Sequence, residues 1–253
     1  MSIDQPEGHF VAYDDPELFY DPFYPDNGFK DEVDRIKTIV EVCKKSVGKR
    51  LLDVACGTGR HLSYLRYDFQ CTGLDLNNSM LKVAAQRLPG VSLILGDLRT
   101  FDLGESFDVI TCLGGGIAYA QTDEELDTTM SNLYRHTTLG GIVVVDPWNT
   151  IESFVDGEEK MKTWDGREEH DPRLQNLKVA RANVVHLENA FSVTEYHYLV
   201  ATRGGSVKHI AETHRLRLFT RQAIAGSLTR AGFTPIRLSS GLGPSRELFL
   251  GLR

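Results

Sequence analysis

One stretch, Leu51–His61 (LLDVACGTGRH), constrains the fold of this chain more than any other. Its apolar residues predict a buried strand. Gly57 and Gly59 predict a sharp turn before a helix, because glycine allows backbone conformations and close approaches that other residues do not. The first amides of such a helix point at whatever lies over the turn. Asp53 is the exception within the strand, since a buried carboxylate is costly without a partner. We therefore expect a ligand above this turn.

Segments of strand and helix character alternate on both sides of this stretch. Strands are expected at 50–55, 71–76, 91–95, 107–113 and 142–146, with helices at 29–46, 60–67, 77–88 and 123–136. A last helix is expected at 220–231, before final strands at 233–238 and 247–252. Such alternation predicts a doubly wound α/β fold, in which helices cover both faces of a mostly parallel sheet.

The pattern changes after Trp148, at the end of the fifth expected strand. Residues 149–175 are polar and irregular and predict a solvated loop. The β-type runs that follow, separated by turn residues, predict an antiparallel hairpin series at 178–187, 191–202 and 206–219. We expect residues 149–219 to form an antiparallel β insert on the substrate side.

The rest of the chain is expected to form one cofactor-binding domain with an N-terminal extension. The domain would comprise residues 29–148 and 220–253. Residues 1–28 are rich in proline and aromatic residues, so long regular structure is not expected there. Their rings would either plug an exposed part of the core or form a lid over a ligand pocket.

Composition excludes several classes of function. The net charge of −7 over 253 residues argues against nucleic acid as a partner, because phosphate backbones need clustered Lys and Arg. No apolar run approaches the roughly 20 residues that a membrane span requires. The N-terminus has no apolar core typical of a secretory signal. The four cysteines are scattered without a CxxC pair, so we expect reduced thiols in a cytoplasmic protein and no metal site.

Two acidic residues follow expected strands, where ligands bind in open α/β sheets. Asp75 closes the second strand, about 20 residues after the glycine turn, and can accept both hydroxyls of a ribose. Asp97 follows the third strand and, with the backbone of Leu98, can receive an adenine amine. A dinucleotide site would place a third glycine at Leu62, so an NAD-dependent oxidoreductase is disfavoured.

The blocks LLDVACGTG, GLDL, GDLRTFDL and FDVITC…GGIVVVDPW resemble a class I S-adenosylmethionine-dependent methyltransferase over residues 29–148. The resemblance implies a Rossmann-like, seven-stranded sheet in which only the last strand is antiparallel. It implies S-adenosyl-L-methionine as cofactor and S-adenosyl-L-homocysteine as product, with Asp53 near the amino-acid end. The full set of expected cofactor-binding residues is Tyr20, Asp53, Ala55, Cys56, Gly57, Gly59, Asp75, Leu76, Met80, Asp97, Leu98 and Cys112.

A narrower resemblance covers almost the whole chain. The pieces ELFYD, DPW, EYHYLVA, ETHRLRLFTR and SRELFLGL are similar to bacterial N,N-dimethyltransferases of dTDP-linked amino sugars. Tyr13 and Tyr20 fall on tyrosines of that family's arm, and Arg246 on an arginine of its substrate side. The family typically has a histidine in the loop after the fourth strand, where this chain has Tyr119.

The resemblance implies N-methylation of a small molecule, with Tyr13, Tyr119 and Arg246 as candidate catalytic residues. The tyrosines would close and orient the reacting site, and Arg246 would hold an anion, with Arg215 and His214 as further candidates. Two alternatives stay open: N- or O-methylation of another small metabolite, and cofactor binding without catalysis. The insert strands are a candidate homodimer interface.

Overall fold

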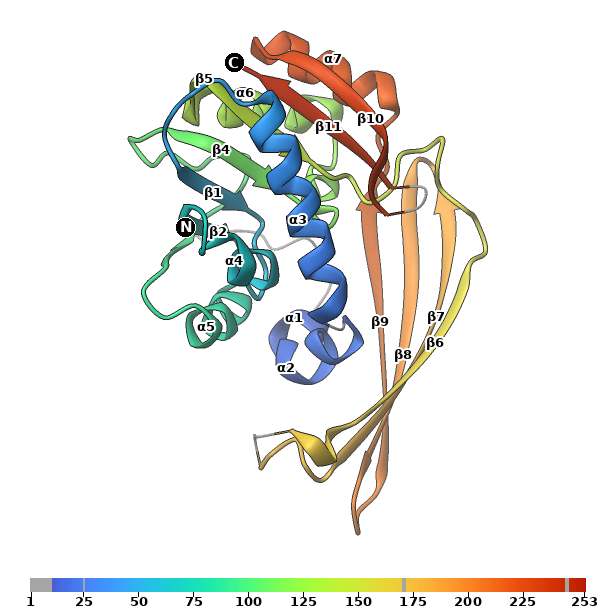
Figure 1. Cartoon of the computed structure of the whole chain (residues 1–253). Helices are drawn as coiled ribbons and strands as arrows, with labels where there is room; N and C mark the ends of the chain where they lie inside the picture. Colours follow the sequence, from blue (N-terminus) through green and yellow to red (C-terminus); the bar gives the residue numbers. More distant parts are fainter. Residues whose placement is uncertain (1–10, 25, 170–171, 244–245) are drawn as a thin grey trace. The chain divides into compact units, whose positions relative to one another are not determined.

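The computed structural model describes residues 11–24, 26–169, 172–243 and 246–253 (Figure 1). The chain divides into two compact units. The larger unit contains residues 26–154 and 217–253, and the smaller unit contains residues 155–216 with the described part of 1–25. The N-terminal residues thus group with the antiparallel strands that the sequence places far along the chain.

The larger unit is built on a seven-stranded sheet of order β10-β11-β5-β4-β1-β2-β3. Its strands are β1 (Arg50–Val54), β2 (Gln70–Asp75), β3 (Ser92–Leu95), β4 (Phe107–Cys112), β5 (Thr137–Val145), β10 (Thr234–Gly243) and β11 (Arg246–Leu252). β1 to β5 pair in parallel, and β11 lies antiparallel between β5 and β10. This confirms the predicted mostly parallel sheet with an antiparallel last strand.

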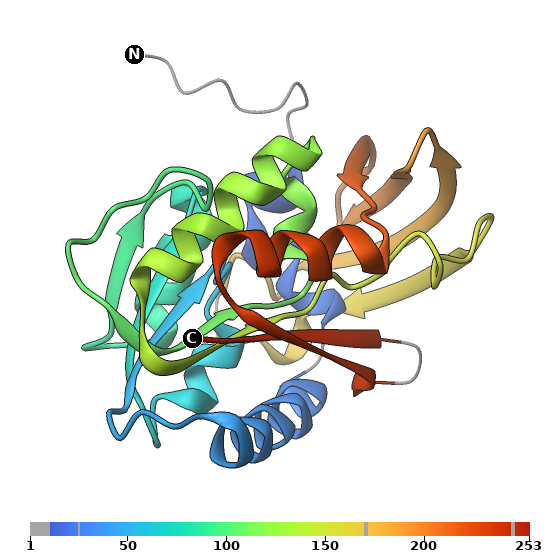
Figure 2. The same cartoon turned by 90° about the horizontal axis from the view of Figure 1, so that it is seen from above.

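Helices cover both faces of this sheet. They are α3 (Asp26–Cys43), α4 (Arg60–Leu65), α5 (Asn78–Arg87), α6 (Asp123–His136) and α7 (Arg221–Ala231). Figure 2 shows α6 and α7 together on one face and α3 on the other. Asn77 caps the start of α5, because its side chain accepts a hydrogen bond from the Met80 amide at 3.0 Å.

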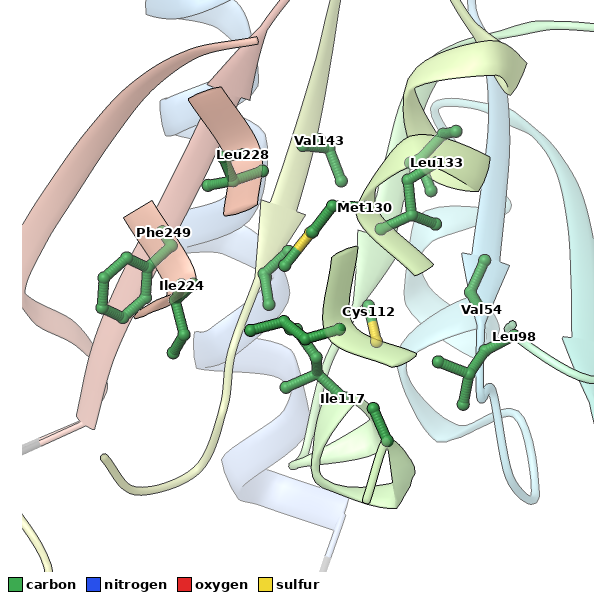
Figure 3. Close-up of a cluster of buried hydrophobic side chains, with 14 of the residues drawn as sticks. Val54, Leu98, Cys112, Ile117, Met130, Leu133, Val143, Ile224, Leu228 and Phe249 are labelled. Carbon is green, nitrogen blue, oxygen red and sulfur yellow. The ribbon is translucent and has the colours of Figure 1, made fainter. Parts of the chain in front are cut away.

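Apolar side chains fill both interfaces between the helices and the sheet. On the face of α6 and α7, Met130 and Ile224 lie with Val143 of β5 in one buried cluster (Figure 3). On the other face, Ile36 of α3 and Leu62 of α4 belong to a second cluster. The sheet is therefore buried on both sides, as parallel sheets require, and its polar residues concentrate at the strand ends.

The smaller unit holds a four-stranded sheet of order β6-β7-β8-β9, with antiparallel pairing of β6 to β7 and of β7 to β8. Its strands are β6 (Glu159–Asp165), β7 (Leu177–Glu188), β8 (Phe191–Thr202) and β9 (Val207–Arg217), with short helices α1 (Val11–Asp14), α2 (Pro16–Phe19), η1 (Asp21–Phe23) and η3 (Gly166–Glu168). Phe19 and Phe23 pack against Tyr198 of β8, with ring centroids 5.1 and 6.3 Å apart. The aromatic residues of the N-terminal segment therefore form the core of this unit with the sheet.

Three predicted boundaries are wrong. β6 lies within the segment 149–175 that was expected to be a solvated loop. It is an edge strand whose charged residues face solvent, so it lacks the apolar signal of a core strand. β5 begins at Thr137, so Gly140 and Gly141 lie within it, and β10 continues to Gly243. None of the helices in the described ranges is long and apolar enough to span a membrane.

Candidate active site

The two glycines of the turn after β1 differ in how much space surrounds them. Ala55, Gly57 and Gly59 all have positive φ angles, of 59°, 55° and 75°. At Gly59, a Cβ atom would lie 2.5 Å from Cδ1 of Leu88, so glycine lets α5 pack against the turn. At Gly57, no atom lies within 4 Å of the Cβ position. The turn is therefore closed by the protein at Gly59 and open to a ligand at Gly57.

Asp75, at the end of β2, holds this turn in place. Its carboxylate accepts hydrogen bonds from the Gly57 amide at 2.7 Å and from the Asn77 amide at 2.8 Å. Burial raises the pKa of Asp75, and these amide bonds oppose the rise. A carboxylate has about four acceptor positions, so Asp75 retains capacity for a further donor. The predicted ribose contact is compatible with this geometry.

Asp53 is a buried carboxylate with little compensation. Its side chain accepts one hydrogen bond, from the Thr111 hydroxyl at 2.7 Å, and the residue is 2% exposed. Burial raises the pKa of Asp53 to about 6, although nearby His61 and the Thr111 bond lower it. A cationic group bound beside Asp53 would stabilise its charged form. The ammonium group of a bound amino acid would be such a cation.

Asp97 has a partner that the sequence did not suggest. Arg99 donates from Nε to Oδ1 at 2.9 Å and from a terminal nitrogen to Oδ2 at 2.6 Å. Partial burial raises the pKa of Asp97, but the bonds from Arg99 outweigh it and the net shift is downward. Arg99 also pairs with Glu125 at 2.9 Å. Asp97 is therefore largely engaged within the chain, and the Leu98 side chain is buried in the core.

Four further expected cofactor residues lie in the turn, at the ends of neighbouring strands or in α5. Cys56 lies within it, and Cys112 ends β4. Burial raises the pKa of both thiols, so neither is a thiolate at neutral pH. Leu76 directly follows β2, and Met80 is buried in the first turn of α5. The described residues contain no group of three or more His, Cys, Asp or Glu side chains able to hold a metal ion.

Arg246, at the start of β11, lies in a network of paired charges. Its two terminal nitrogens donate to Glu32 of α3 and to Asp146, which follows β5. Asp146 is fully buried and also accepts hydrogen bonds from the amides of Gly114 and Trp148, both at 3.0 Å. Two carboxylates therefore neutralise this guanidinium. The charge of Arg246 is thus offset within the chain, and the expectation that it holds an anion stays a prediction.

This network connects several loops at the carboxyl ends of the strands. Glu32 also accepts a hydrogen bond from His61, at the start of α4, at 2.8 Å. The Arg246 guanidinium lies 4.4 Å from the ring centre of Trp148, whose φ of 65° is unusual for a large residue. Sequence reasoning missed the partners Glu32 and Asp146. The DPW motif after β5 marked Asp146 as a notable acidic residue, and no sequence pattern marked Glu32.

The three expected tyrosines belong to different units. Tyr119 ends the short helix η2 (Gly116–Tyr119) after β4 and packs half-buried against the core of the larger unit. Tyr13 and Tyr20 lie in the smaller unit, with ring centres 6.1 Å apart. The Tyr13 ring is 5.2 Å from His214. Arg215, the other anion candidate, is exposed, with its guanidinium 4.1 Å from the ring centre of Phe191.

Comparison with known proteins assigns this architecture. A family model described as a methyltransferase domain matches residues 51–141. A dTDP-3-amino-3,4,6-trideoxy-alpha-D-glucopyranose N,N-dimethyltransferase from Streptomyces venezuelae is 35% identical over 239 residues, which cover 92% of this chain and 95% of that protein. A dTDP-4-amino-2,3,4,6-tetradeoxy-D-glucose N,N-dimethyltransferase from Saccharopolyspora spinosa is 37% identical over 204 residues, covering 80% of this chain and 78% of that one.

Solved structures agree. DesVI from Streptomyces venezuelae superposes with a TM-score of 0.82 and 32% identity, covering 96% of this chain and 98% of its own. The sugar N-methyltransferase KedS8 from a Streptoalloteichus species has a TM-score of 0.84 and 33% identity over 100% of this chain and 98% of its own. The chain therefore belongs to the family of the dTDP-amino-sugar N,N-dimethyltransferases, and it is an S-adenosylmethionine-dependent methyltransferase.

Proposed function

We propose that this enzyme methylates the amine of a nucleotide-linked amino sugar, and that it transfers two methyl groups in succession. One observation carries the proposal. The similarity to the Streptomyces venezuelae enzyme spans 92% of this chain, so it includes the smaller unit as well as the methyltransferase domain at 51–141. All four cysteines are free, which supports our further proposal that the enzyme works in the cytoplasm.

The turn after β1 fits the cofactor in its shape and its charges. We propose that the methionine part lies over Gly57, where the position of a Cβ atom is open, and that its ammonium pairs with Asp53. The remaining acceptor capacity of Asp75 would take a ribose hydroxyl. Since Arg99 engages Asp97, we assign adenine recognition to the Leu98 backbone as well as to Asp97. Bound S-adenosylmethionine supplies a methyl group already activated by its sulfonium.

The remaining work of the protein is to orient the amine and to exclude water. An amine near its own pKa loses a proton to water readily, so a strong base is not obligatory. We propose that Tyr119 serves as an aromatic wall and hydrogen-bonding group beside the reacting amine. Tyr13 and Tyr20 are proposed to contribute aromatic surface, which attracts sulfonium and ammonium groups.

The direct test is a methyl-transfer assay with purified protein, S-adenosylmethionine and a dTDP-linked amino sugar, followed by mass spectrometry. We expect products that carry one and then two added methyl groups. The variant Asp75→Ala serves as a cofactor-binding control and should lose turnover. Methylation of free amines or hydroxyl metabolites, with none of the nucleotide sugar, would overturn the proposal in favour of another small-metabolite methyltransferase.

A further inference from the structure

The smaller unit buries an arginine without an acidic partner. Arg181, on β7, is 5% exposed, and its buried Nε atom has no hydrogen-bond partner. Within the described ranges, no carboxylate forms an ion pair with it. Its guanidinium instead lies over three aromatic rings, 4.4 Å from the ring centre of Phe23, 5.2 Å from that of Tyr196 and 5.7 Å from that of Tyr24. A buried cation in this state is costly.

A second cation lies directly beside it. Lys162 of β6 is the cross-strand partner of Arg181, so the two side chains share one face of the sheet. The Lys162 ammonium donates to the Phe23 carbonyl at 2.9 Å and lies 5.5 Å from the Tyr24 ring centre. Burial lowers the pKa of Lys162, and the neighbouring charge of Arg181 lowers it further. Two like charges side by side destabilise a sheet.

The buried acid of the same face is already satisfied. Glu212 of β9 accepts hydrogen bonds from the Tyr198 hydroxyl at 2.9 Å and from the Ala12 amide at 3.3 Å. It also pairs with His214 at 3.2 Å. Burial raises the pKa of Glu212, but these partners, His214 foremost, bring it below its ordinary value. Glu212 is thus balanced locally, whereas neither Arg181 nor Lys162 forms an ion pair with a carboxylate in the described ranges.

We propose that Arg181 and Lys162 form a phosphate-binding site, with the rings of Phe23, Tyr24 and Tyr196 as its walls. The inference rests on the proposed function: the occupant is the diphosphate of the nucleotide-linked amino sugar. Arginine suits this role because its planar group binds phosphate through two parallel hydrogen bonds, and lysine adds a point charge. Lys162 is exposed while Arg181 is buried, so the cationic pair runs from solvent into the unit.

The test is calorimetric binding of dTDP, and separately of inorganic pyrophosphate, to the full chain saturated with S-adenosylhomocysteine. We expect Arg181→Met to weaken both by roughly tenfold or more, and Arg181→Lys and Lys162→Met to weaken them less. Arg203→Met removes an exposed arginine from a turn of the same unit and should change neither affinity. In turnover, Arg181→Met should raise KM for the sugar nucleotide more than it lowers kcat.

The outcomes separate this site from the proposed function. If folded Arg181→Met binds dTDP and pyrophosphate as tightly as the wild type, the site is overturned and the proposed function stands. If the wild type binds pyrophosphate through Arg181 but does not methylate a dTDP-linked amino sugar, the site stands and the proposed function fails. If Arg181→Met does not fold, the variants Arg181→Lys and Lys162→Met test the site instead. Unchanged affinities for dTDP and pyrophosphate in both variants would overturn it.

Discussion

Each unit of this chain packs an arginine against an aromatic ring, and the two arginines differ in their partners. The Arg246 guanidinium lies 4.4 Å from the Trp148 ring centre, and the Arg181 guanidinium lies 4.4 Å from that of Phe23. Arg246 also pairs with two carboxylates, whereas Arg181 pairs with none in the described part of the chain. Removing one partner of a buried ion pair destabilises a fold strongly, because the other charge is left uncompensated. An unpaired one adds a cost that a ligand of opposite charge can remove.

The same difference recurs within the larger unit. Asp146 receives two amide bonds and an arginine, while Asp53 receives a single hydroxyl. The space beside Gly59 is filled by Leu88, while that beside Gly57 is open. The chain itself supplies the partners of Asp146 and fills the space beside Gly59. It does neither for Asp53 and Gly57. We therefore propose that Asp146 and Gly59 serve the fold, whereas Asp53 and Gly57 serve the cofactor.

The largest effect is expected on removing the paired arginine. Arg246→Met leaves Asp146 and Glu32 without their cation, so it should lower the free energy of unfolding by about 3 kcal/mol. Urea denaturation measures this, and the double variant Arg246→Met/Asp146→Asn should recover part of the loss. Unchanged stability together with weaker dTDP binding would instead show that Arg246 serves the substrate, and the contrast between the two arginines would fail.

The two glycines of the turn differ in the same way, because protein atoms fill the space beside Gly59 and leave the space beside Gly57 open. Gly59→Ala would place a methyl group against Leu88 in addition to backbone strain, so we expect a loss of about 2–3 kcal/mol in unfolding free energy. Gly57→Ala adds strain alone, about 1 kcal/mol. Its main effect should be weaker S-adenosylhomocysteine binding in calorimetry. Equal stability losses and unchanged cofactor affinity would contradict the open position at Gly57.

A smaller effect is expected at Asp53, with opposite signs for stability and binding. Its pKa of about 6 lies above the ordinary 3.8, so the folded protein holds a proton that the unfolded chain releases. The stabilisation is complete below about pH 4 and is lost as the pH rises through about 6. For a shift of this size the loss at pH 7 is about 3 kcal/mol at most, and Asp53→Asn should raise the free energy of unfolding at pH 7 by a part of it.

The charged neighbours of Asp53 must be considered in that experiment. His61 favours its ionised form, and Asp75 opposes it. Unfolding measured from pH 4 to pH 7 in Asp53→Asn and in His61→Gln separates their contributions. We expect Asp53→Asn also to weaken S-adenosylmethionine binding, because the ammonium loses its partner. A variant that is less stable at pH 7 and binds the cofactor normally would assign Asp53 to the fold.

Sequence patterns predicted the sheet and the cofactor turn because both depend on local signals. Apolar runs identify buried strands, and Gly57, Gly59 and Asp75 lie close along the chain. The arginine network could not be predicted, since Arg246 and Glu32 are 214 residues apart. Arg181 left no signal either, because one arginine in an alternating strand usually faces solvent. Only packing against rings from a distant segment reveals that it is buried.

The most direct test of this account is urea unfolding of the wild type and Arg181→Met, each with and without saturating dTDP. We predict that the variant alone is at least as stable as the wild type, because burying a charge without an acidic partner costs more than its contacts with the three rings return. We also predict that dTDP stabilises the wild type clearly more than the variant. A variant that is several kcal/mol less stable by itself, and that dTDP stabilises as much as the wild type, would contradict the account.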